Sequence, residues 1–177
     1  RPIVIERGSR VEKRTCDVQK FWESGILNPK SNVQFGEGGA GTFSDGKLNT
    51  SVKDPSGRNR LVLETFVRFG ADPSILYDNK PHIGTDVLSE VIVNMREFLV
   101  DKGATFVFDT CVNNLDIVSQ KLLSVYTDSD SNSNSEIKTD VCVLALGHSA
   151  RDTFDMLYNK GFDMECKSFA VGFRVEH

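Results

Sequence analysis

The densest run of glycines lies between Phe35 and Gly46, with five glycines in twelve positions. Glycine leaves its amide N–H unshielded, so such a loop can bring bare backbone against an anion or a flat cofactor. Lys47 follows the last of these glycines and adds a cation to the same loop. The loop is therefore the first place in the chain at which to expect a bound ligand.

Two phosphate-binding fingerprints overlap in this loop, and the flanking residues argue against both. Residues 36–41 match G-x-G-x-x-G, but Gly46 breaks the helix that has to follow, and Asp54 lies in a turn rather than at a strand end. Residues 41–47 match G-x-x-x-x-G-K, but Leu48 stands where a magnesium-binding Ser or Thr is needed. A tight glycine turn that packs under a neighbouring element is the alternative to a ligand-binding loop.

Length and charge narrow the class of protein. A chain of 177 residues, 39% hydrophobic and 26% charged, suits one sizeable core, or one domain and part of another. Its net charge of −4 argues against a nucleic-acid-binding surface, which usually shows as a basic patch. Apolar runs fall short of the ~18 residues that span a bilayer, so no membrane partner is expected.

The cysteines and histidines predict neither disulfides nor a metal site. The cysteines are widely spaced, without a Cys-x-x-Cys pair: Cys16, Cys111, Cys142 and Cys166. We expect free thiols in a reducing compartment, and hence a cytoplasmic protein. The histidines show no metal-ligand spacing: His82, His148 and His177.

Hydrophobic periodicity predicts an alternation of strands and helices. Helical spacing of apolar residues predicts helices at 10–24, 58–69, 87–102 and 152–160. Apolar or alternating runs predict strands at 2–6, 104–109, 111–118, 121–127 and 139–147. The first and last of these strands are expected to be buried, and Thr85 or Asp86 to cap the third helix. The polar run 128–135 is typical of a variable hairpin loop, and the whole pattern indicates an α/β fold with a mainly parallel sheet.

Both ends of the chain are unusual. Arg1 leads straight into the first strand, and 169–177 is another strand-like run without a polar tail. Natural termini are usually polar and loosely held, so we expect a piece of a longer protein.

Two strand ends carry residue types suited to a cofactor. Glu6 closes the first strand, and in dinucleotide-binding folds a carboxylate at the end of the second strand accepts hydrogen bonds from the adenosine ribose. Taken alone, a strand-ending glutamate is more often solvated. The strand 139–147 ends in small residues that let a backbone lie against a cofactor.

Three segments occur in the order seen in flavoproteins with two dinucleotide-binding domains: Glu6-Arg7-Gly8, the glycine loop to Thr50, and 139–147. More narrowly, the chain resembles a bacterial family of uncharacterised FAD-dependent dehydrogenases, and the similarity spans nearly the whole chain. The segments that carry the resemblance are 33–50, 80–86, 147–152 and 169–177.

The resemblance implies an FAD site assembled from these segments. It implies that Glu6, followed by Arg7, binds the FAD ribose and that the strand around Val112 offers backbone to the adenine. The residues implied to pass close to the cofactor after the last strand are Ala145, Leu146 and Gly147. The residues implied on the isoalloxazine side are Gly38, Gly39, Gly41, Ser44, Asp45, Gly46, Lys47 and Leu48.

The implied fold is a partial Rossmann-like FAD/NAD(P)-binding fold with three layers, a mainly parallel sheet, a β-meander and its first strand missing. That strand, with its G-x-G-x-x-G, is expected before Arg1 and is the missing partner segment of this chain. Its absence exposes two central sheet edges, so we expect the fragment to hold FAD only weakly. The implied divisions are 1–50 and 86–150 for the FAD-binding domain, 51–85 for an inserted segment, and 151–177 for the start of a substrate domain.

The implied function is that of an FAD-dependent oxidoreductase that moves hydride between an unknown small-molecule substrate and the flavin, with NAD(P)H as a candidate electron donor. Lys47 is the candidate to stabilise negative charge on the reduced flavin, against a solvated lysine. His148 is either a proton donor or a cap of the next helix. His82 is a third candidate, but a buried loop histidine bonded to backbone is the simpler interpretation. The alternative class is a flavoprotein-like scaffold with little or no turnover.

Overall fold

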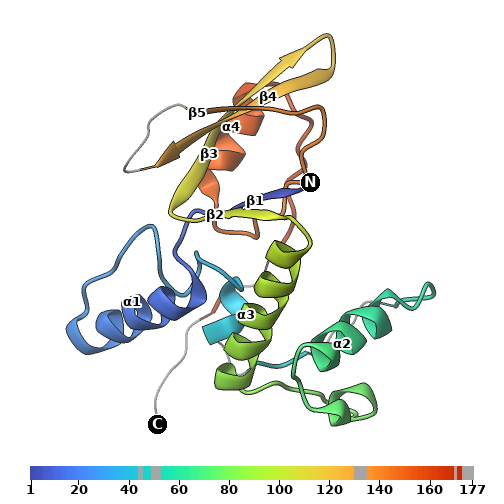
Figure 1. Cartoon of the computed structure of the whole chain (residues 1–177). Helices are drawn as coiled ribbons and strands as arrows, with labels where there is room; N and C mark the ends of the chain where they lie inside the picture. The colour runs from blue at the N-terminus through green and yellow to red at the C-terminus, as the bar shows by residue number, and fades with distance from the viewer. Residues whose placement is uncertain (44–45, 49–52, 130–134, 170, 173–177) are drawn as a thin grey trace. The chain divides into compact units, whose positions relative to one another are not determined.

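The structure, a computed structural model, describes residues 1–43, 46–48, 53–129, 135–169 and 171–172. The chain divides into two compact units, Arg1–Val143 and Leu144–His177. The fold is mixed α/β: the described strands form a parallel two-stranded sheet and an antiparallel three-stranded sheet (Figure 1). The expected α/β class and the expected β-meander are confirmed, whereas the single parallel pair among the described strands does not show a mainly parallel Rossmann-like sheet, which stays a prediction.

The parallel pair consists of β1 (Ile3–Ile5) and β2 (Thr105–Val107), with Ile3 opposite Thr105. Both strands were expected from their apolar runs. The expected burial of the first strand is wrong, because the side chains of Ile3 and Val4 are 48% and 39% exposed. Among the described strands β1 pairs only with β2, and a sheet of two strands offers few neighbouring side chains to cover those of β1.

The antiparallel sheet is a meander of β3 (Thr110–Val118), β4 (Lys121–Ser129) and β5 (Ser135–Lys138). The expected strands at 111–118 and 121–127 are confirmed as β3 and β4. Ser119 and Gln120 between them both have positive φ, as a tight two-residue hairpin turn requires. Of the expected hairpin loop at 128–135, residues 130–134 lie outside the described residues.

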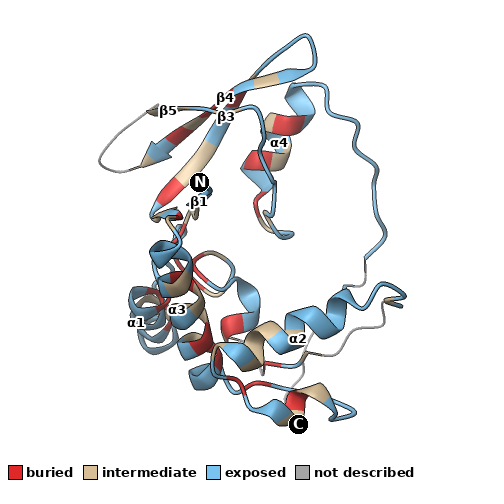
Figure 2. Cartoon of the chain, turned by 45° about the vertical axis from the view of Figure 1, so that its right-hand side comes forward, coloured by how far each residue is buried: buried red, intermediate tan, exposed pale blue. Residues whose placement is uncertain are grey.

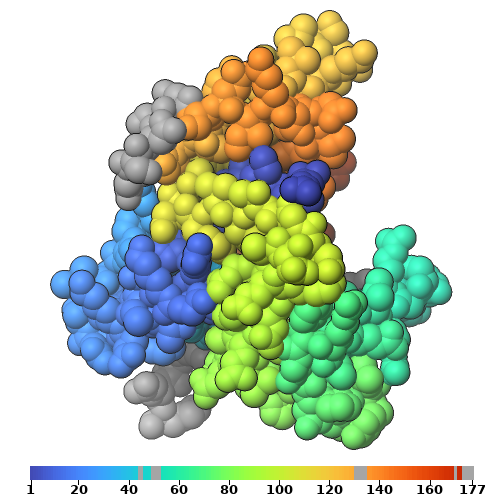
Figure 3. Space-filling view, viewed as in Figure 1, coloured from blue at the N-terminus to red at the C-terminus, as the bar shows by residue number. Residues whose placement is uncertain are grey.

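Three helices of the first unit match the expected ones within a few residues: α1 (Val11–Ser24), α2 (Arg58–Arg68) and α3 (Thr85–Asp101). The N-cap of α3 is Gly84 rather than Thr85 or Asp86, so the helix begins earlier than its polar residues suggested. In the space-filling view the surfaces of α1 and α3 meet on one face (Figure 3). Every helix in the described ranges is too short or too polar to cross a bilayer.

The main apolar cluster lies between α2, α3 and the short helix η2 (Pro73–Leu76). Its buried members are Ala71, Ile75, Ile83, Leu88 and Val91. None of the residues of α2 is itself buried, and the helix presents only a half-buried stripe (Figure 2). A second short helix, η1 (Ala40–Phe43), follows the glycine loop.

The run 141–146 is not a strand, which corrects the expectation of a buried strand at 139–147. Val141 and Val143 are 70% and 84% exposed. An apolar run becomes a strand only when a neighbouring strand satisfies its backbone groups, and the described strands offer it no partner. In the second unit, α4 (Arg151–Asn159) matches the expected helix, whereas most of 169–177 lies outside the described residues.

Candidate functional site

The C-terminal end of β1 is joined to two neighbouring segments by backbone hydrogen bonds. The amide of Glu6 donates to the carbonyl of Val107 at 2.9 Å, and the amide of Thr110 donates to the carbonyl of Glu6 at 3.1 Å. The amide of Asp109 donates to the carbonyl of Gly8 at 3.0 Å. The ends of β1 and β2 and the start of β3 therefore form one edge. Ligands of open α/β sheets bind at such carboxyl edges.

The carboxylate of Glu6 connects this edge to the glycine loop. Its Oε1 accepts the amide of Gly8 at 2.8 Å and the amide of Gly36 at 2.9 Å. Its Oε2 makes no hydrogen bond to the part of the chain that the structure describes. Glu6 thus has a structural role that the sequence did not predict, and one carboxylate oxygen remains for a ligand hydroxyl.

Arg7 and the start of β3 lie beside Glu6. A guanidinium nitrogen of Arg7 donates to the sulfur of Cys111 at 3.1 Å, and the guanidinium lies 4.7 Å from the centre of the Phe35 ring. Val112 follows Cys111 on β3, which pairs on one side with β4. Three residues of the expected adenosine site, Glu6, Arg7 and Val112, therefore come from adjoining segments.

A fully buried arginine holds the glycine loop. Arg14 of α1 is 0% exposed and donates to four backbone carbonyls, those of Asn32 (2.8 Å), Gly36 (3.2 Å), Glu37 (2.7 Å) and Gly39 (2.8 Å). Desolvation by burial lowers the pKa of Arg14 to about 10, which still leaves it cationic near neutral pH. Gly36 has φ +121°, and a Cβ there would lie 2.3 Å from Arg14 Cδ, so only glycine fits.

Glu37 anchors the other side of the loop. Its Oε2 accepts the amide of Val11 at 2.8 Å and a guanidinium N–H of Arg96 at 2.5 Å. Because Arg10 gives α1 no side-chain cap, Glu37 supplies the acceptor at this helix N-terminus. Arg96 of α3 also pairs with Glu12, so one buried guanidinium links α3, α1 and the loop. Desolvation by burial raises the pKa of Glu37, and the hydrogen bond from Arg96 lowers that of Glu12.

A cavity of about 680 Å³ opens beside the connection from β2 to β3. Its lining includes the charged or aromatic residues Lys13, Lys30, Phe108 and Asp109, and the polar Thr110. Lys13 Nζ lies 3.6 Å from Asp109 Oδ2 at this wall. The cavity therefore adjoins the edge on which Glu6 lies and has the size of a small-molecule site.

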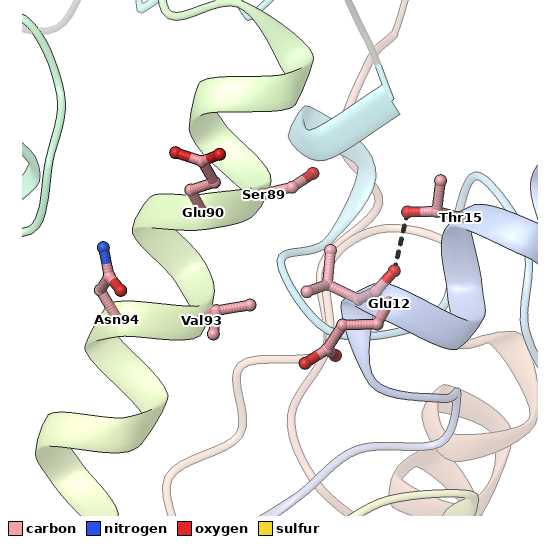
Figure 4. A pocket seen from close by; sticks show the side chains of 7 residues that line it. Glu12, Thr15, Ser89, Glu90, Val93 and Asn94 are labelled. Carbon is pink, nitrogen blue, oxygen red and sulfur yellow. Dashed lines mark hydrogen bonds between the residues drawn. The ribbon is translucent and has the colours of Figure 1, made fainter.

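A smaller cavity of about 310 Å³ lies between α1 and α3. Ser89 and Val93 of α3 point toward Glu12 of α1, whereas Glu90 and Asn94 point away (Figure 4). The hydroxyl of Thr15 donates to the carbonyl of Val11, and the carboxylate of Glu12 is engaged by Arg96. Nothing in this cavity indicates a particular ligand.

The loop segment 46–48 lies against 81–83, which brings two catalytic candidates together. Leu48 N–H donates to Pro81 O and Ile83 N–H donates to Gly46 O, both at 2.9 Å, so Lys47 and His82 face each other in an antiparallel bridge. His82 is exposed, and the interpretation as a buried loop histidine is wrong. Gly46 has φ +64°, and a Cβ there would lie 1.6 Å from the carbonyl oxygen of Ile83.

The remaining candidates fall into three groups. Gly38, Gly39 and Gly41 are exposed next to the Arg14 anchor, where their backbone is accessible. Ser44 and Asp45 lie outside the described residues. The candidates of the second unit are Ala145, Leu146, Gly147 and His148, and their participation in the site stays a prediction. The ring of His148 lies 3.3 Å from Ser149 Oγ and, within the described ranges, bonds no amide of α4, so the capping interpretation lacks support.

Sequence reasoning missed Arg14, Glu37 and Arg96. One signal was available: the buried residues of α1 are Val11, Arg14 and Val18, so an arginine occupies the apolar stripe of that helix. A charged residue in such a stripe is expected to be paired when buried. Arg96 gives the same signal, because it is buried on α3 together with Leu88 and Val91. The sequence offers no comparable signal for Glu37, because it lies on a loop without periodicity.

Comparison with known proteins identifies a relative but not a function. No family model matches the chain. A protein of Clostridium beijerinckii, described as an uncharacterised protein, is 45% identical over all 177 residues. The chain spans about a third (32%) of the length of that relative. The similarity therefore covers this whole sequence, and the description of the relative assigns no activity.

Proposed function

We propose that this chain is part of an FAD-dependent oxidoreductase and that the carboxyl edge of β1 binds the adenosine end of FAD. The observation that carries the proposal is the carboxylate of Glu6 at the end of a parallel strand pair, with Oε1 fixed by two amides and Oε2 unbonded within the described chain. A carboxylate in this position is suited to accept hydrogen bonds from ribose hydroxyls.

The surrounding residues fit an adenosine group. The edge of β3 that does not face β4 offers backbone groups near Val112 for an adenine. The planar groups of Arg7 and Phe35 lie next to Glu6, and the cavity beside Asp109 has room for a ligand. A Rossmann-like arrangement, in which a further strand of the longer protein pairs with β1 and other elements cover the faces of the sheet, accounts for the exposure of Ile3 and Val4.

The glycine loop is assigned to the isoalloxazine side. Its exposed backbone at Gly38, Gly39 and Gly41 is held in place by Arg14, so it can approach a flat ring system without losing its conformation. Bound FAD would supply hydride transfer, with NAD(P)H as the candidate donor. Lys47 would supply positive charge on this side. The cysteines are thiols rather than disulfides, which supports the proposal of a reducing compartment such as the cytoplasm.

The test uses the full-length protein that contains this sequence, purified with and without the substitution Glu6→Gln. Glutamine keeps an oxygen for the amides of Gly8 and Gly36 but replaces the second oxygen by a donor. We expect bound flavin in the unsubstituted protein, reduced by NAD(P)H or a substrate without oxygen, and flavin affinity lowered about 10-fold or more in Glu6→Gln. Glu23→Gln, on an exposed carboxylate of α1, is the matched control.

Two outcomes would contradict parts of this proposal. Flavin that no donor reduces would favour the scaffold without turnover. Full flavin content in Glu6→Gln would remove the assignment of the site to the β1 edge. Residues 1–177 expressed alone are expected to hold FAD weakly, and a monomeric fragment with one FAD per chain would contradict that expectation.

A further inference from the structure

Lys47 and His82 come from segments far apart in the sequence and face each other across a short bridge. The two hydrogen bonds of this bridge flank the pair, from Leu48 N–H to Pro81 O and from Ile83 N–H to Gly46 O. The pair is therefore the non-hydrogen-bonded kind, in which opposite side chains stand on the same face with Cβ atoms about 4.5–5.5 Å apart. Both residues are exposed.

The face of the bridge opposite Lys47 and His82 packs against the main apolar cluster. Ile83 is 3% exposed and belongs to the main apolar cluster, against which Leu48 also packs. Side chains alternate across an extended segment, so residues 47 and 82 face outward because their neighbours face inward. The close approach of Gly46 to the carbonyl of Ile83 leaves little freedom for the bridge to shift. The two polar side chains are thus presented by a rigid support.

We propose that Lys47 and His82 form a binding site for a carboxylate group of the substrate. An ammonium group and an imidazole N–H, side by side on one face, can each donate to one oxygen of a carboxylate. Pro81 and Ile83, the neighbours of His82, carry no charge to oppose such a ligand. The assignment of this anion to the substrate rests on the proposed function, which puts Lys47 on the flavin side.

The test measures binding at this site without any turnover. Full-length protein with isotope-labelled histidine is titrated with succinate, and the imidazole signals of His82 are followed by NMR. We expect a saturable shift, with the dissociation constant for succinate raised about 10-fold or more in Lys47→Met and the residual binding lost in the double variant Lys47→Met/His82→Gln. Lys121→Met, at the start of β4, is the matched control and is expected to bind succinate as the unsubstituted protein does.

Three outcomes would overturn the proposal. One is the absence of a saturable shift, and another is an equal shift in Lys47→Met. The third is tighter binding of inorganic phosphate than of succinate, which would replace the carboxylate by a phosphoryl ligand. Loss of flavin binding in Glu6→Gln together with intact succinate binding supports both sites separately. Succinate binding in a protein that never binds flavin would refute the proposed function and leave the carboxylate site standing.

Discussion

Two apolar runs of similar composition have different fates in this chain. Ile3–Ile5 forms β1, in register with β2, and its end is joined to β3 and to the glycine loop. The run from Val141 to Leu146 is equally apolar but forms neither a strand nor a helix, and most of it is exposed. The difference shows that the partner, not the run, decides whether a strand forms. The end of β1 is organised because Glu6 and the Arg14 anchor satisfy the backbone around it.

The largest change in the free energy of unfolding is expected on replacing Arg14, next to the C-terminal end of β1. Arg14→Met keeps much of the buried volume but removes the four hydrogen bonds to loop carbonyls. We expect the free energy of unfolding to fall by about 3–5 kcal/mol, measured by urea denaturation. Arg10→Met, on an exposed arginine one turn earlier, is the control and should cost less than about 1 kcal/mol. Equal losses in the two variants would contradict the anchoring role.

The next largest change in the free energy of unfolding is expected from a substitution in the glycine loop. Gly36→Ala places a Cβ against Arg14 at a positive φ, and we expect a loss of about 2–4 kcal/mol in the free energy of unfolding. Gly41→Ala is the matched control, because a Cβ there meets nothing within 4 Å. Its unfolding free energy should change by less than about 0.5 kcal/mol. A harmless Gly36→Ala would mean that the loop is not held as described.

A smaller change in the free energy of unfolding is expected from the ionisation of Glu37 as the pH is varied. Desolvation raises the folded-state pKa of Glu37 above its ordinary 4.5. Its favourable contribution is therefore fully present below the unfolded pKa and is lost as pH rises through the folded pKa. When the free energy of unfolding is measured against pH, the Glu37→Gln variant should lack this decrease in stability. Glu12→Gln is the control with the opposite sign, because Glu12 has a lowered pKa and its contribution is lost as pH falls. An unchanged curve in Glu37→Gln would contradict the burial of this carboxyl.

The smallest change in the free energy of unfolding is expected in the run 141–146, which forms no strand. Val143→Ala should change the free energy of unfolding by less than about 0.5 kcal/mol, since this side chain is 84% exposed. Val125→Ala, on β4 at 3% exposure, should cost about 2 kcal/mol in the same assay. A large loss in Val143→Ala would show that this run is packed against something in solution.

Local pattern predicted most elements, because helix spacing and strand alternation are properties of a short window. It predicted α3 and β3 closely, and it failed at 141–146, where strand formation depends on a distant partner. It predicted Glu6 as a site residue, which stays a prediction, but missed that two amides fix its carboxylate. It treated Lys47 and His82 separately, because nothing local predicts the pairing of segments so far apart along the chain.

The central claim is that the β1 edge binds the adenosine end of FAD. It is tested most directly by the affinities of the flavin-free full-length protein for FAD and for FMN, which lacks the adenosine. The proposal predicts that FAD binds about 100-fold or more tightly than FMN, and that Glu6→Gln narrows this ratio by weakening FAD alone. Equal affinities for FAD and FMN, or an unchanged ratio in Glu6→Gln, would contradict it.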